Sequence, residues 1–319
     1  MSKYIIKETI SKHDEQNSGA YLDENFWPNW NETIENFKTK LITCRDNQIP
    51  FSLLRISHSE MTLFYYMSGV NKFVGNWERQ SKAYTFDSNN YLKFFESINS
   101  SDYISTQIGY DFHKWLNDIR NYNNCYLEYK SKNKLVELFN NRTIFQKYNN
   151  QYKFTNLINL PMDIIYGLIA IKWFFKTFKN KIGLIGSAPK IQTIIELMKY
   201  KEYQKYLGTE IFTDYIGIPE KKAMDNPNLE KNIIENVKKS SCDIFLIGAG
   251  TSKLKFYYLL KKTKNCIFLD VGHGIDVIAG HCDLLRPYLG GWQNYRVRNE
   301  NIRIDKMYNE GKDGDIIYL

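Results

Sequence analysis

The run Cys242–Thr251, CDIFLIGAGT, decides the fold class predicted for this chain. It is a short apolar segment that ends in glycines, which is typical of a buried strand followed by a turn. Lys181–Gly186 (KIGLIG) and Cys266–Val271 (CIFLDV) repeat this pattern, and Leu229–Lys239 carries apolar residues at helical spacing. Because strands and helices alternate at the spacing of right-handed crossovers, the sequence predicts an α/β, Rossmann-like fold with a mostly parallel sheet flanked by helices.

The first half of the chain is less regular, and it sets the expected domain organisation. We expect residues 1–24 to form an N-terminal extension, 25–299 a single catalytic domain with a helical insertion over 86–178, and 300–319 a C-terminal tail. Further helices are expected over Asn25–Cys44, Ser59–Met67, Asp102–Ile119, Met162–Phe178, Pro189–Tyr200 and Ser252–Lys262, and further strands over Pro50–Ser57 and Glu210–Ile218.

The composition indicates an ordinary globular protein of the cell interior. Hydrophobic residues make up 43% of the chain and charged residues 24%, which is enough for a core and argues against disorder. The net charge of +8 would attract anions, but the Lys-rich stretch Lys253–Lys264 has the spacing of a solvated helix face, so no nucleic-acid partner is expected. Five scattered cysteines and an N-terminus without an apolar signal stretch favour a cytoplasmic protein.

The most apolar segment, Met162–Phe178, is not expected to cross a membrane. Lys172 interrupts it, and it is too short to span a bilayer. Its simplest interpretation is a buried helix, and the alternative is peripheral membrane contact through Trp173, Phe174 and Phe175. An oligomer is neither indicated nor excluded.

Three expected strands end in loops of small, polar or glycine residues. Glycine lets a backbone approach a ligand closely, and a helix that starts just after it presents N–H groups and a positive dipole end to phosphate. One such loop more often only makes a turn, but three together are expected to hold a nucleotide diphosphate. The candidate residues are Gly186 and Ser187 after the first strand, Gly248, Gly250 and Thr251 after the second, and Gly272 after the third.

An early strand ends in a cluster of polar groups, because Ser52–Met61 reads SLLRISHSEM. Arg55, with Ser57 beside it, suits a phosphate or carboxylate, although a structural ion pair is equally common for arginine. His58 and Glu60 point the same way if the segment is extended, and they would then ligate a divalent cation, Mn²⁺ or Mg²⁺. In the alternative, Glu60 caps the next helix and His58 is a surface hydrogen-bonding residue.

A second polar cluster lies at the end of the last apolar strand. Asp270 interrupts that strand just before the turn, and His273 and Asp276 follow it. A carboxylate in this place would bind ribose hydroxyls or orient His273, and its structural role would be to hold the loop by accepting backbone N–H bonds.

The segments RISHSE, IGLIGSAP, IGIPEKKA, FLIGAGTSK and FLDVGHGID together resemble the bacterial GT-D-type glycosyltransferases, which are Rossmann-like nucleotide-sugar transferases. The resemblance covers Asn25–Ala279. The family's signature, Arg-hydrophobic-Gly-Asp-Gly-Glu, places an Asp-x-Glu pair on a metal ion. Arg55 and Glu60 match that signature, whereas Ser57 and Ser59 replace its glycines and His58 replaces its Asp.

The resemblance implies that Glu60 is a metal ligand and that His58 either substitutes for the missing ligand or marks a loss of metal dependence. It also implies a nucleotide-sugar site at Asp270–His273, which matches the family's Asp-hydrophobic-Gly-His element. The implied activity is transfer of a sugar from a nucleoside diphosphate sugar, UDP-linked, to a saccharide or glycoconjugate acceptor. Glu60, His273 and Asp276 remain alternatives for the general base. The alternative function is a non-catalytic nucleotide- or polysaccharide-binding protein.

Overall fold

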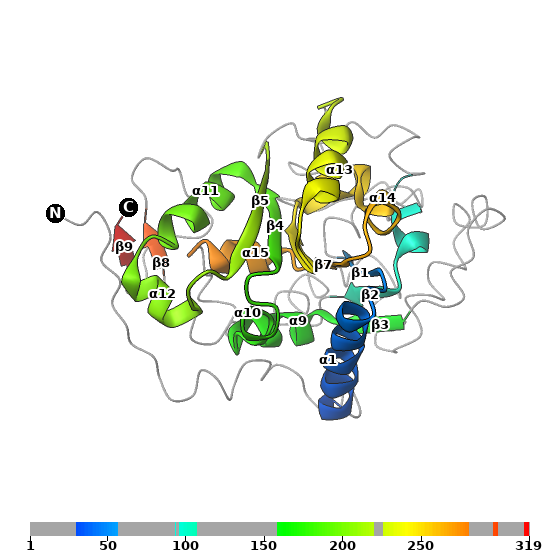
Figure 1. Cartoon of the computed structure of the whole chain (residues 1–319), viewed down its shortest axis with the longest axis horizontal. Coiled ribbons are helices and arrows are strands. Elements are labelled where there is room, and N and C mark those ends of the chain that lie inside the picture. Colours follow the sequence, from blue (N-terminus) through cyan, green and yellow to red (C-terminus); the bar gives the residue numbers. More distant parts are fainter. Residues whose placement is uncertain are drawn as a thin grey trace, which may run out of the picture.

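A single parallel sheet forms the centre of the molecule (Figure 1). The computed structural model describes residues 30–56, 93, 96–106, 158–219, 226–280, 296–298 and 316–318. Seven strands lie in the order β3-β2-β1-β7-β6-β4-β5, and every neighbouring pair is parallel. The strands are β1 (Phe51–Ile56), β2 (Tyr103–Thr106), β3 (Ile158–Pro161), β4 (Ile182–Ser187), β5 (Phe212–Ile218), β6 (Ile244–Gly248) and β7 (Ile267–Asp270).

Helices cover both faces of this sheet. The described helices are α1 (Trp30–Asp46), α9 (Met162–Ala170), α10 (Trp173–Thr177), α11 (Ala188–Leu197), α12 (Lys201–Leu207), α13 (Leu229–Lys239), the 3₁₀ helix η2 (Gly250–Lys255), α14 (Tyr257–Thr263) and α15 (His273–Ile278). They are joined by the parallel crossovers that the strand order requires. The α/β fold expected from the sequence, with its mostly parallel sheet and flanking helices, is confirmed.

Alternate residues along the central strands divide the apolar core between the two faces. Phe51 and Leu53 of β1 and Leu246 of β6 belong to a buried cluster that also contains residues of α1, α9, α10, α11, α12 and α15. On the other face, the rings of Phe245 and Phe268 stack with centroids 5.8 Å apart. The helices α13 and α14 contact each other and the strands β5 and β7, so they form the second outer layer.

The strand order contains a topological switch point. The chain passes from β4 outward to the edge strand β5, but it passes from β6 in the opposite direction to β7. Connections that diverge in this way leave room outside the carboxyl ends of the two strands, which is where open α/β sheets bind ligands. The predicted glycine loops at Gly186 and Gly248 lie at these two ends, and the two residues are register partners.

The structure corrects several expected elements in the first half. Asp102–Ile119 was expected to be helical, but Tyr103–Thr106 forms β2, a strand too short and too rich in hydroxyl side chains to show an apolar run. Ile158–Pro161 forms β3, an edge strand, which tolerates a proline. The expected helical insertion over 86–178 therefore contributes two strands to the main sheet.

The apolar segment Met162–Phe178 is two helices, not one. The break falls at Lys172, whose φ of 62° places it in the left-handed region. Phe174 and Phe175 are buried in the core, which contradicts membrane contact through both of them. No helix among the described residues is both long and apolar enough to span a bilayer.

The remaining differences concern one helix start and elements that the sequence did not predict, among them α12. Ser252–Lys262 begins as the 3₁₀ helix η2 and becomes α-helical only at Tyr257. A separate parallel pair joins β8 (Arg296–Arg298) to β9 (Ile316–Tyr318), so the expected tail at 300–319 pairs with the segment before it. The expected extension at 1–24 and the helix expected over Ser59–Met67 lie outside the described residues.

A glycine at position 248 is required by the packing of α15 on the sheet. A Cβ there would lie 2.6 Å from Cγ1 of Ile275 and 2.7 Å from the carbonyl oxygen of Gly272. We therefore expect Gly248→Ala to lower the free energy of unfolding by about 1–3 kcal/mol, the usual cost of overpacking, in urea unfolding followed by circular dichroism.

A double-mutant cycle with Ile275→Ala tests the cause of that loss. The shortened side chain removes the contact with Cγ1, but the Cβ of residue 275, at 2.8 Å, and the Gly272 carbonyl remain. The double variant should therefore be less destabilised than the sum of the single variants, without full recovery. A Gly248→Ala variant as stable as the wild type would contradict this packing.

Candidate functional site

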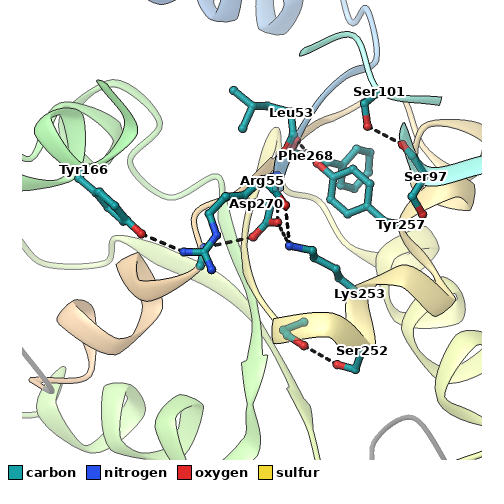
Figure 2. Close-up of polar contacts among 12 residues, drawn as sticks. Leu53, Arg55, Ser97, Ser101, Tyr166, Ser252, Lys253, Tyr257, Phe268 and Asp270 are labelled. Carbon is teal, nitrogen blue, oxygen red and sulfur yellow. Dashed lines mark hydrogen bonds and ion pairs between the residues drawn. The ribbon is translucent and has the colours of Figure 1, made fainter. Parts of the chain in front are cut away.

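A buried ion pair joins the ends of β6 and β7 (Figure 2). Asp270 is the last residue of β7, and Lys253 lies in η2, just after β6. Each side chain is only 1% exposed. The Nζ atom of Lys253 donates to the Asp270 carboxylate and, at 2.8 Å, to the backbone carbonyl of Arg55 at the end of β1. One ammonium group therefore links the ends of three neighbouring strands.

The Asp270 carboxylate also holds two backbone amides. It accepts a hydrogen bond from the N–H of Arg55 at 3.1 Å and another from the N–H of Gly272 at 3.2 Å. A buried carboxylate is stable when several N–H and ammonium groups donate hydrogen bonds to it. The structural role predicted for Asp270, holding the loop by accepting backbone N–H bonds, is therefore present, and its predicted binding of ribose hydroxyls stays a prediction.

Arg55 is almost entirely buried at the end of β1. Its Nη1 atom donates to the hydroxyl of Tyr166 in α9 at 2.9 Å (Figure 2). Its guanidinium lies directly over Gly272, where a Cβ would be 2.2 Å from Nη1. Gly272 has a φ of +47°, so both the close approach and the backbone conformation favour glycine there. The predicted residues Arg55, Asp270 and Gly272 thus lie together.

Tyr257 closes the same region from α14. Its hydroxyl donates to the carbonyl of Leu53 in β1 and lies 3.1 Å from the carbonyl of Phe268 in β7. Complete burial raises the pKa of this phenol well above its ordinary value, so the tyrosine remains a neutral hydrogen-bond donor.

Sequence reasoning missed Lys253, Tyr257 and Tyr166. The interpretation of Lys253–Lys264 as a solvated face is wrong for its first residue, because the 3₁₀ geometry of η2 turns Lys253 into the sheet edge. A signal was present in the sequence. An aspartate that interrupts a buried strand, such as Asp270, needs a cationic partner, and a lysine just after the neighbouring strand is well placed to supply one.

The carboxyl ends of β4 and β6 form the second part of the site. The side chain of Ile275 in α15 covers both Gly186 and Gly248, so close helix packing accounts for these two glycines. Ser187 and Thr251 follow them and are 9% and 5% exposed. Neither hydroxyl has a hydrogen-bond partner within the described part of the chain.

His273 and Asp276 form a third group, in the first turn of α15. Nδ1 of His273 lies 2.7 Å from Oδ2 of Asp276, and Nζ of Lys190 in α11 lies 2.7 Å from Oδ1. Burial by itself raises the pKa of Asp276, but the charge of Lys190 and the hydrogen bond with His273 outweigh it, and the pKa of this carboxyl lies below its usual range. Asp276 therefore stays ionised and anchors two cationic or basic groups.

The structure brings the described candidates to one edge of the sheet. They lie in β1, β7, β6 and β4, or in the turns and helices η2 and α15 that follow β6 and β7, and these four strands are consecutive in the strand order. Ser57, His58 and Glu60 lie outside the described residues, so the predicted Mn²⁺ or Mg²⁺ site stays a prediction. Within the described ranges, no group of three His, Cys, Asp or Glu side chains is arranged to hold a metal ion. The described candidates are Arg55, Gly186, Ser187, Gly248, Gly250, Thr251, Asp270, Gly272, His273 and Asp276.

Removing the ammonium of Lys253 should be costly. Lys253→Met leaves the Asp270 carboxylate buried without its cation, so we expect the free energy of unfolding to fall by about 3–5 kcal/mol. Urea unfolding at pH 7 measures the loss. Lys261→Met is the matched control, since Lys261 pairs with Asp102 at 2.8 Å where both side chains are partly exposed, and such pairs contribute at most about 1 kcal/mol.

The double variant Lys253→Met/Asp270→Asn tests whether the loss of stability comes from the unpaired charge or from altered side-chain packing. It removes both charges, so it should recover most of the stability that Lys253→Met loses. Equal losses in Lys253→Met and Lys261→Met would show that the buried pair does not hold the strand ends together.

The Asp276 cluster predicts a pH-dependent contribution to stability. A carboxyl whose pKa is lowered by folding adds stability that is fully present above its unfolded-state pKa of about 3.9, and that is lost as the pH falls towards the folded-state value. Asp276→Asn should therefore destabilise the protein at pH 7 and by a smaller amount at pH 3, in urea unfolding at each pH.

Asp46→Asn is the control for that experiment. Asp46 is exposed at the end of α1, where it pairs with Arg45, so its removal should matter little at either pH. A loss of stability in Asp276→Asn that is as large at pH 3 as at pH 7 would contradict the lowered pKa.

The comparisons with known proteins give no family assignment. No protein-family model matches the chain, and no curated protein matches it. The likeness to the GT-D-type glycosyltransferases therefore rests on the sequence motifs quoted above.

Proposed function

We propose that this chain is a glycosyltransferase that moves a sugar from a nucleoside diphosphate sugar, UDP-linked, to a saccharide or glycoconjugate acceptor. The observation that carries the proposal is the convergence of Arg55, Asp270, Ser187, Thr251 and His273 on the carboxyl edge of one parallel sheet. That edge is where α/β proteins bind nucleotides. The likeness of the RISHSE and DVGH motifs to the GT-D family specifies the chemistry further.

Transfer requires the departing diphosphate to be stabilised. The amino terminus of α11, which begins at Ala188 just after β4, offers a positive dipole end to an anion. In the proposal, Glu60 and His58 add a divalent cation, which would act as a Lewis acid on the phosphate oxygens. The Lys253–Asp270 pair fixes the end of β1, from which the Ser57–Glu60 segment continues. The cation ligands would thus start from a rigid strand end.

Transfer also requires a base for the acceptor hydroxyl, and the geometry favours His273 over Asp276. The carboxylate of Asp276 lies against Nδ1 of His273, an arrangement that favours the tautomer with its proton on Nδ1 and makes Nε2 the basic nitrogen. The pKa of Asp276 is lowered by Lys190 and His273 against the effect of burial, so this carboxylate is itself a weak base. Glu60 remains the other candidate.

Purified protein incubated with a panel of sugar nucleotides and Mn²⁺ tests the proposal. We expect hydrolysis or transfer with at least one donor, measured as release of the nucleoside diphosphate. Glu60→Ala should abolish it, because that change removes the proposed cation ligand. Glu235→Ala, on the exposed side of α13, is the matched control and should keep full activity.

Two outcomes would overturn the assignment. Full activity in Glu60→Ala would remove Glu60 from the mechanism. UDP binding that needs no metal, together with no turnover of any donor, would instead support the non-catalytic nucleotide-binding alternative.

A further inference from the structure

Two buried hydroxyls at the switch point have no assigned structural role. Ser187 occupies the N-cap position of α11, yet its side chain makes no capping hydrogen bond. Thr251 lies in the first turn of η2 after β6. The oxygen of each is buried and has no hydrogen-bond partner among the described residues. An unsatisfied buried hydroxyl destabilises a protein, so two of them after neighbouring strand ends call for an explanation.

The position of the two hydroxyls points to an anion. Ser187 sits at the amino terminus of a ten-residue helix, where the first-turn amides and the helix dipole favour negative charge. Thr251 follows β6, the strand paired with β4 along the whole of its length. Next to Thr251, a Cβ on Gly250 would meet nothing within 4 Å, so the chain leaves room at that glycine.

Two nearby lysines of the described chain have carboxylate partners of their own. Lys253 is bound to Asp270, and Lys190, in the first turn of α11, is bound to Asp276. The carboxyl ends of β4 and β6 also present neutral hydroxyl groups and the first-turn amides of α11. This donor set is the one that proteins use to hold phosphate without a metal ion.

We propose that Ser187 and Thr251 form a phosphate subsite that anchors a diphosphate without a divalent cation. The inference deepens the proposed function and rests on it for the identity of the natural ligand, the donor's diphosphate. If hydroxyls anchor the phosphates, binding and catalysis use different groups: the subsite binds the diphosphate, and any cation at Glu60 is needed for sugar transfer. Binding of pyrophosphate or UDP should then survive removal of divalent cations.

Titration calorimetry with pyrophosphate and with UDP, both in EDTA, measures the subsite directly. Thr251→Val and Ser187→Ala should each weaken binding about tenfold, as expected for the loss of one hydrogen bond to a charged group. Thr193→Val is the matched control in α11, because its hydroxyl already donates to the carbonyl of Pro189 at 3.0 Å. That variant should bind as the wild type does.

The stability of the ligand-free protein gives a second readout, which should not fall when ligand binding weakens. Because the Thr251 hydroxyl has no partner in the described chain, Thr251→Val should unfold at the same urea concentration as the wild type or at a higher one. A purely structural role for Thr251 predicts the reverse, a loss of stability with unchanged affinity for pyrophosphate, and that result would overturn the proposal.

The outcomes also separate this inference from the proposed function. Pyrophosphate binding that is lost in Thr251→Val, in a protein that turns over no sugar nucleotide, would support the subsite while the transferase proposal fails. Sugar transfer with unchanged donor affinity in both Thr251→Val and Ser187→Ala would support the transferase and overturn the subsite. Absence of any binding by the wild type in EDTA would also overturn it.

Discussion

The buried pair of Lys253 and Asp270 is the interaction on which the arrangement of the strand ends depends. Its ammonium and carboxylate groups together contact β1, β7, η2 and the turn at Gly272. A buried ion pair adds little net stability by itself, because the desolvation of two charges offsets their attraction. Its main effect is to fix the relative positions of the strand ends. Each charge requires its partner and its backbone donors in one place, so alternative positions of the strand ends leave a charge unsatisfied.

The two sides of the candidate site, at the ends of β1 and β7 and at the ends of β4 and β6, differ in their hydrogen bonding. At β1 and β7, Arg55 and Asp270 are buried and bonded to Tyr166, Lys253 and backbone groups, so they form a rigid support. At β4 and β6, the strand ends carry hydroxyls without such partners in the described chain. Ligand binding is the more natural role for the second side, since a group that has no protein partner can donate to a substrate at low cost.

Residues predicted from the sequence converge in space for reasons that the sequence shows only in part. The glycine loops and Asp270 stand out because each follows an apolar run, and parallel strands bring such ends to one edge. Lys253 does not stand out, since it begins a lysine-rich stretch whose other members look solvated. The strands β2 and β3 were also missed. Four residues with three hydroxyl side chains, or with a proline, carry little periodicity, and pairing decides their structure: β2 pairs with β1, and β3 pairs with β2.

The sequence by itself determined the α/β class, the apolar strands β4, β6 and β7, and the position of the polar loops after them, because these depend on local periodicity and on glycine. The tertiary structure alone decided which strand ends are neighbours, and that the amino-terminal strand β1 lies beside the late strand β7. Only that pairing brings Arg55 to Asp270, and only the turn of η2 buries Lys253 against both. Contacts between residues 198 and 215 positions apart depend on chain topology and on charge satisfaction, which no local pattern encodes.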